Sequence, residues 1–201
     1  AVSYEGGEAL LLVLKASYTQ GFPEWHFLPL ALGSGDPRKR SVAPPAAHIA
    51  AILKGDERQG FLYEATESQR FNHYLLHHLV KKGRSPRDFR FVRQEHLEED
   101  TSTLESTPRV VKTSGHNLSL AFGESYFLKV FRRLDPSLNP DLEINRYGGG
   151  NGMPVPGYLG HFQYNRPSGE PFTLALLQPY VKNQGSAWQY FFDVSRRYIE
   201  R

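Results

Sequence analysis

The chain contains no cysteine, so disulfide bonds, thiolate metal sites and a cysteine nucleophile are all excluded. A sequence without cysteine fits a reducing compartment, and we expect a cytoplasmic protein. No apolar run approaches the ~18 residues that a membrane-spanning helix needs. Residues 1–7 also lack the basic and then apolar pattern of a secretory signal. We therefore expect no membrane partner.

The residues that are present predict a folded chain of ordinary composition. Of the 201 residues, 39% are hydrophobic and 22% are charged, which is enough to bury a core. Aromatic residues make up 13%, and they favour strands. The net charge of +3 is slight, so we expect no nucleic-acid partner.

The first part of the chain reads as an antiparallel-sheet unit with one long helix, over residues 1–92. The helix is expected over Ser68 to Lys82, where apolar residues recur at spacings of three and four. Ser68 is the expected N-cap, and Gly83 is the expected C′ residue. The expected strands are 9–18, 25–32, 48–53, 60–65 and 89–92.

A polar linker, 93–104, is expected to separate this unit from a second one at 105–182. The second unit reads as a five-stranded antiparallel sheet with one helix, which begins at the N-cap Asn139 and at Pro140. A last helix over 185–200 occupies the remaining segment, 183–201. The predicted fold class is α+β. The expected strands of the second sheet are 109–113, 118–122, 126–132, 157–164 and 172–178.

Lys129 is the most informative residue for function. Strand alternation places it between Phe127 and Phe131 on one face, and the residues of the other face are also apolar. A lysine on a covered strand needs a carboxylate or a phosphate, because an unpaired buried ammonium costs several kcal/mol. The alternative is a side chain that extends to a nearby edge of the sheet.

Glu143 is the expected partner of Lys129. It lies in the helix that follows the lysine strand, as does the glutamate that holds the phosphate-binding lysine of kinases. It stands at position N4, too late to act as a capping-box residue. A surface pair with Arg146 is the alternative.

The turn at 113–119 (TSGHNLS) lies between the first two strands of the second sheet. In a kinase-like lobe, such a hairpin covers the nucleotide phosphates with backbone N–H groups and small polar side chains. Taken alone, the motif is equally typical of an ordinary hairpin turn.

These features resemble the N-terminal part of bacterial maltokinases, ATP-dependent sugar kinases that are often fused to trehalose synthase. The strand and helix block is the specific part of the resemblance, and the N-terminal match is looser. The resembling segments are Phe127–Leu134 (FLKVFRRL), Asn139–Ile144 (NPDLEI), Leu177–Val181 (LQPYV), Asn183–Trp188 (NQGSAW), 18–24 and 27–32.

The resemblance implies phosphoryl transfer from ATP to maltose, which gives maltose 1-phosphate for α-glucan synthesis. It implies that Lys129 binds the α- and β-phosphates and that Glu143 holds it. Asn117 and Ser119 would line the phosphate turn. The backbone of Gln178 and Tyr180 would contact adenine. The unit at 105–182 would then be the ATP-binding lobe, and the unit at 1–92 an N-terminal cap.

Two departures from the family pattern concern the site. The family usually has Ser-Asn-Thr in the phosphate turn, where this chain has His116-Asn117-Leu118, and Ser186 stands where an aspartate is usual. No aspartate after Asp141 has the sequence neighbours of a catalytic base or a metal ligand. We therefore expect a fragment that is inactive alone, with the Mg²⁺ ligands and the maltose contacts in an absent catalytic lobe.

Three other interpretations of the sequence are weighed against a kinase lobe. The first is a protein-interaction or regulatory module of a trehalose synthase fusion. The second is polyanion binding by the basic segment 81–93, although an acidic run follows it directly. The third is a metal pair at His73 and His77, for which no third ligand is evident, so we expect no metal site.

Overall fold

The protein is described by a computed structural model of residues 1–201. The structure describes all of them except 36–48, 55–58, 82–84, 98, 114–115 and 201. Some expectations therefore lie outside the described residues. These are Gly83 as the C′ residue, the start of the strand at 48–53, and the centre of the phosphate turn.

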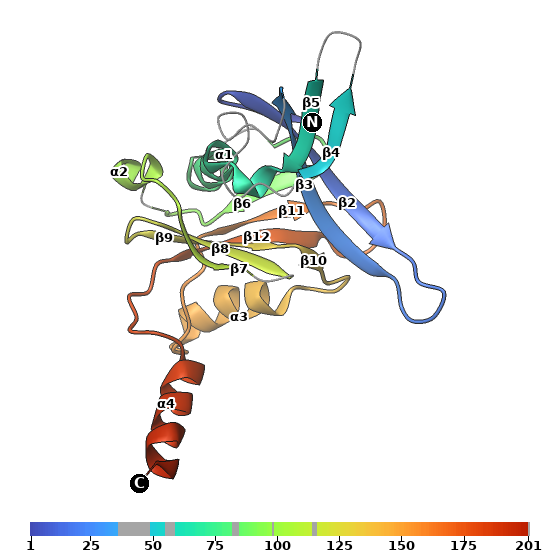
Figure 1. Ribbon diagram of the computed structural model, residues 1–201. Coiled ribbons are helices and arrows are strands. Elements are labelled where there is room, and N and C mark those ends of the chain that lie inside the picture. Colours follow the sequence, from blue (N-terminus) through green and yellow to red (C-terminus); the bar gives the residue numbers. More distant parts are fainter. Residues whose placement is uncertain (36–48, 55–58, 82–84, 98, 114–115, 201) are drawn as a thin grey trace.

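The described residues form two antiparallel sheets and four α-helices, so the α+β prediction is confirmed. Figure 1 shows their arrangement. In the first sheet the order is β1-β2-β3-β5-β4, and β10 also pairs with β3. Its strands are β1 (Val2–Tyr4), β2 (Gly7–Ala16), β3 (Glu24–Ser34), β4 (Ile49–Lys54), β5 (Gln59–Glu64) and β10 (Arg133–Leu134).

The second sheet has the order β6-β11-β12-β9-β8-β7. Its strands are β6 (Phe89–Arg93), β7 (Arg109–Thr113), β8 (Asn117–Phe122), β9 (Tyr126–Phe131), β11 (Gly160–Tyr164) and β12 (Phe172–Pro179). The helices are α1 (Gln69–Val80), α2 (Thr101–Leu104), α3 (Pro140–Gly148) and α4 (Ala187–Ile199), with short 3-10 turns η1 (Ala65–Glu67) and η2 (Gly149–Asn151).

The second sheet contains one strand more than the five predicted, because β6 joins its edge. The strand pairs with β11, and Phe91 lies opposite Phe162. Their rings stack with centroids 4.3 Å apart, and Phe89 stacks on the same ring at 5.7 Å. Aromatic stacking explains why this strand joins the second sheet. The predicted division after residue 92 thus falls inside β6.

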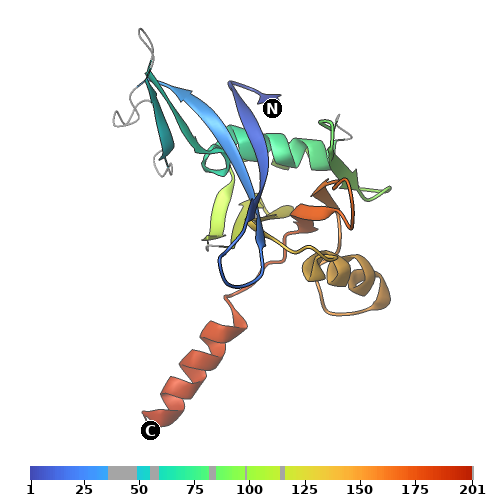
Figure 2. The same ribbon diagram turned by 90° about the vertical axis from the view of Figure 1, so that its right-hand side faces the viewer.

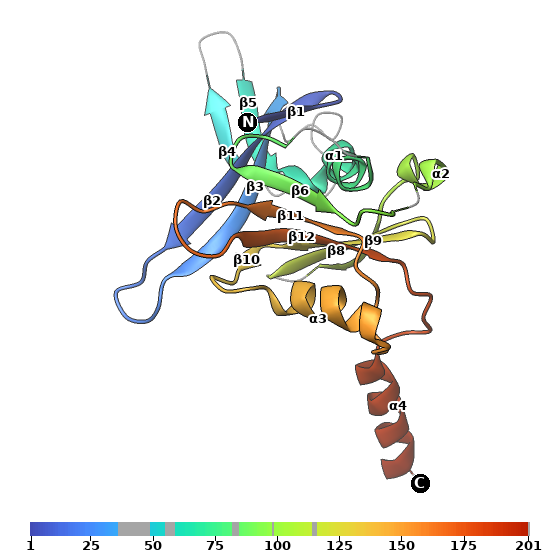
Figure 3. The same cartoon turned by 180° about the vertical axis from the view of Figure 1, so that it is seen from behind.

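Helix α1 and helix α3 cover opposite faces of the second sheet (Figures 1 and 3). α1 spans most of its predicted range, and its apolar stripe is fully buried at Phe71, Leu75 and Leu79. Ser68 is its N-cap by backbone geometry, without a capping hydrogen bond from its side chain. One cluster of buried side chains joins α1 to both sheets. The two sheets therefore share a core.

Helix α4 extends away from the two sheets (Figures 1 and 2). None of its residues is buried, although Trp188, Phe191 and Tyr198 are large and apolar. In the part of the chain that the structure describes, no helix has the length and apolar character needed to cross a membrane.

Candidate functional site

The face of the second sheet that α3 covers carries most of the predicted site residues. Lys129 of β9 lies opposite Ser119 of β8 on one side and Leu176 of β12 on the other. Residues opposite each other in an antiparallel pair point to the same face. Asn117 and Gln178 lie on this face as well, opposite Phe131 and Phe127. The predicted position of Lys129 on a central strand is confirmed.

Asp141, rather than Glu143, forms the ion pair with Lys129. The Lys129 ammonium donates to Asp141 Oδ2, and the two side chains are 25% and 44% exposed. Glu143 is exposed. It follows Asp141 by two residues, which is about 200° around the helix, and this rotation turns it away from the strand. The predicted pairing of Lys129 with Glu143 is wrong.

A second polar contact fixes α3 one turn further along. Asn145 lies four residues after Asp141, on the same face of the helix, and it is buried. Its Oδ1 accepts a hydrogen bond of 2.6 Å from the side-chain amide of buried Gln178. The Asn145 amide also donates to the Asp141 carbonyl at 2.6 Å. The sequence led us to expect a role for the backbone of Gln178. In the structure its side chain binds Asn145 and so attaches α3 to the sheet.

Tyr180 lies where β12 ends, and its backbone donor already has a partner. Its N–H donates to the Ser125 carbonyl at 2.9 Å. Its hydroxyl accepts from Arg109, whose guanidinium lies 5.9 Å from the tyrosine ring centre. The predicted adenine contact, if made through this N–H, would require the bond to Ser125 to open.

A polar hollow lies beside the first turn of α3. Its volume is about 350 Å³, and the Lys129 partner Asp141 is part of its wall. Asn139, also in the wall, is the N-cap of α3, and its Oδ1 accepts from the Leu142 N–H at 3.2 Å. The further lining residues are His116, Asn117, Phe131, Arg133, Leu134, Asp135 and Pro136.

Asp100 is a polar centre that the sequence did not indicate. Asp100 was expected in a linker. In the structure it is the N-cap of α2, and its carboxylate contacts Ser125 in the turn between β8 and β9. Its carboxylate accepts hydrogen bonds of 2.6 Å from both Ser102 and Ser125. Those two bonds, followed by one from Thr103, hold the Asp100 pKa below its ordinary value. Because the Ser125 carbonyl binds Tyr180, Asp100 also supports the end of β12.

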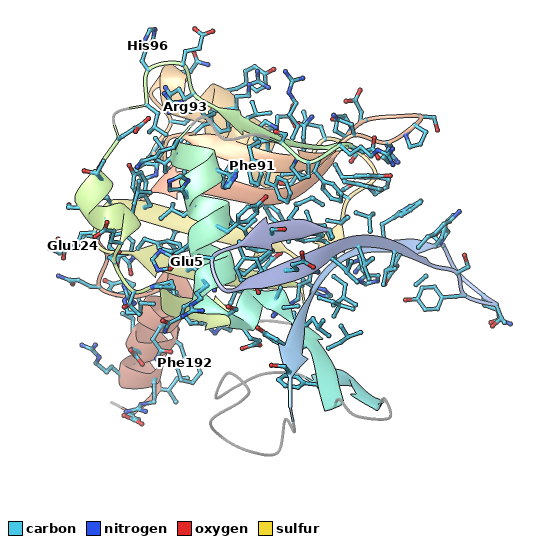
Figure 4. The ribbon with its side chains drawn as sticks, turned by 90° about the horizontal axis from the view of Figure 1, so that it is seen from above. Glu5, Phe91, Arg93, His96, Glu124 and Phe192 are labelled. Atoms are coloured by element: carbon cyan, nitrogen blue, oxygen red, sulfur yellow. The ribbon has the colours of Figure 1, made fainter. Side chains whose placement is uncertain are left out.

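Two residues of the remaining sequence signals, His73 and Arg93, have structural partners. His73 donates from Nδ1 to the Leu104 carbonyl at 2.9 Å, since a carbonyl only accepts. Arg93 lies with Phe91 along one end of α1 (Figure 4) and pairs with Glu99 at 2.9 Å. Among the described residues, no group of three or more histidines and carboxylates is placed to hold a metal ion.

A comparison of the chain with models of known protein families finds no match.

Proposed function

We propose that residues 105–182 are the ATP-binding lobe of a sugar kinase of the maltokinase type, which transfers phosphate from ATP to maltose. The order of the strands around Lys129 is the observation that carries this proposal. When the strands of the second sheet are counted along the chain from β7, the lysine lies on the third, and β10 and α3 come after it. The order in the sheet is first, second, third, fifth, fourth, with β6 at the edge beyond the fourth.

This arrangement supports the proposal because protein kinases place their phosphate-binding lysine on the third strand. The lysine there pairs with a carboxylate of the next helix. Asp141 is the carboxylate that occupies this role here. An aspartate is one methylene shorter than glutamate, and its place in the first turn of α3 brings it to the lysine.

The proposed roles of the residues follow their places on the sheet. Lys129 binds the α- and β-phosphates, and Asp141 orients its ammonium. Asn117 and Ser119 lie nearest the turn over the phosphates. Gln178 and the Tyr180 carbonyl, at the end of β12, contact the adenine in this proposal. The positive end of the α3 dipole favours a polyphosphate. The hollow beside it is lined by Arg133 and His116 and also by the carboxylates of Asp135 and Asp141.

Among the described residues no group of three or more histidines and carboxylates is placed to hold a metal ion, and no step is assigned to Mg²⁺ through them. The resemblance places its ligands, the catalytic base and the maltose contacts in a second lobe. It also supplies a fused or associated trehalose synthase as the proposed partner. We therefore expect this chain to bind ATP without transferring phosphate to maltose.

Titration of the chain with a fluorescent ATP analogue tests the proposal. We expect saturable binding that unlabelled ATP competes away and that Lys129→Met abolishes, because the methionine fills the same space without the charge. Lys15→Met is the matched control, since Lys15 is an exposed strand lysine of the first sheet. Absence of binding, or equal loss in both variants, would contradict the proposal.

A further inference from the structure

The segment between β9 and α3 connects the Lys129 strand to the helix that holds Lys129. We call residues 132–139 the connector. The connector begins with a crossover, because β10 leaves the second sheet and pairs with β3 of the first (Figure 1). Arg133 lies opposite His26, and the Phe27 N–H donates to the Arg132 carbonyl at 2.8 Å.

Two ion pairs attach the connector to the first sheet. Arg132 donates from Nε and Nη2 to Glu64 Oε1, both at 2.8 Å. These two side chains are only 17% and 14% exposed. Arg133 pairs with Glu24 at 2.8 Å and is half exposed. The Arg132–Glu64 pair is the stronger attachment, because it is shielded from solvent and two guanidinium nitrogens contact one carboxylate oxygen.

The opposite side of the connector holds two parts of the proposed nucleotide site. The Arg132 N–H donates to the carbonyl of His116, in the turn over the phosphates, at 2.7 Å. At its other end the connector supplies Asn139, the N-cap of α3. Between these points, Leu134 is buried at 4% exposure. The connector therefore links the first sheet to both the turn and the helix.

We propose that Glu64 and Arg132 are positioning residues, through which the first sheet sets the place of α3 and of the phosphate turn, and so the affinity for nucleotide. This inference rests on the proposed function. Loss of the Glu64 charge weakens the attachment of the partly buried Arg132 guanidinium to the first sheet. The connector then loosens, and the Lys129–Asp141 pair loosens with it.

Glu64→Gln in the whole chain tests the inference, because glutamine keeps the shape and removes the charge. Glu99→Gln is the matched control, since Glu99 forms an ion pair with Arg93 that lies outside the connector. We expect Glu64→Gln to weaken binding of the ATP analogue by at least about fivefold, a typical size for coupling between sites. The control should bind as the unchanged chain does.

Hydrogen exchange and the NMR signal of the Lys129 ammonium give readouts that do not depend on nucleotide. In Glu64→Gln, α3 amides should exchange faster while β12 amides do not, and the ammonium signal should shift. If Glu64→Gln fails to fold, Glu24→Gln at the exposed pair serves instead, with smaller changes of the same kind. A folded variant with unchanged α3 exchange and an unchanged ammonium signal would overturn the inference. If the unchanged chain binds no analogue, the proposed function fails, and these two readouts still decide the inference.

Discussion

A lysine ammonium on the covered face of a sheet needs a counter-charge, and Asp141 provides it for Lys129. The Lys129 Nζ also lies 5.2 Å from the ring centre of Phe131, a favourable distance for a cation and an aromatic face. These contacts hold the ammonium beside the start of α3. The charge of Lys129 is therefore fixed in position before any ligand binds.

The Lys129–Asp141 pair predicts that removing the charge of Asp141 and removing that of Glu143 have different effects on stability. We expect Asp141→Asn to lower the free energy of unfolding by about 1 kcal/mol, because the lysine loses its counter-charge in a partly exposed site. Glu143→Gln should change it by less than about 0.5 kcal/mol, as for other exposed positions. Urea denaturation measures both values. A larger effect at Glu143 would contradict the assigned pair.

His161 predicts how stability depends on pH. Burial lowers its pKa, and Arg146 adds to the effect, while the bond to Gln163 opposes it. Below its ordinary value of about 6.5, the unfolded chain takes up a proton that the folded chain resists. Stability should therefore fall as the pH drops from about 6.5, by at most about 1.4 kcal/mol per pH unit from this residue.

Urea denaturation at pH values from about 8 to 5 measures this slope. His161→Gln should make the slope between pH 6.5 and 5 shallower, because the variant has no group to protonate there. His77 has a pKa lowered in the same direction, so a residual slope is expected. An identical slope in the variant and the unchanged chain would rule out a role for His161.

Among the elements, α3 depends on its N-cap, since nine residues are too few for a helix that is stable by itself. We expect Asn139→Ala to cost about 0.5–2 kcal/mol of stability, because the Leu142 N–H loses its acceptor. Ser186→Ala removes the equivalent bond to Gln189 in α4, where no residue is buried. Urea denaturation should detect the first change and not the second. Equal costs would show that α4 contributes to the folded core.

The elements were largely predictable because their signals are local. Apolar spacing located α1, and the Asn139-Pro140 pair located the start of α3. β1 and α2 were missed, since three and four residues are too short to show a period. The choice of Asp141 over Glu143 depends on the rotation of α3 about its axis. Spacing along the chain does not define that rotation relative to the sheet.

At the scale of the whole molecule, contacts between residues far apart in the sequence join the two sheets. Phe27 of the first sheet meets Phe162 of the second at 6.3 Å between ring centres, and Trp25 meets Phe172 at 5.2 Å. These pairs join segments more than a hundred residues apart. The sequence shows that each residue is apolar but not which residue it meets. For the same reason, neither the crossover of β10 nor the Arg132–Glu64 pair was predictable.

The central claim is that ATP binds on the α3-covered face of the second sheet. The most direct measurement is an NMR titration of the isotope-labelled chain with ATP, following the backbone amide signals. We predict that the largest shifts fall at Asn117, Ser119, Lys129 and Tyr180, and that ATP moves few signals in β1 to β5. Shifts concentrated in the first sheet or in the basic segment around Arg90, with none near Lys129, would contradict the claim.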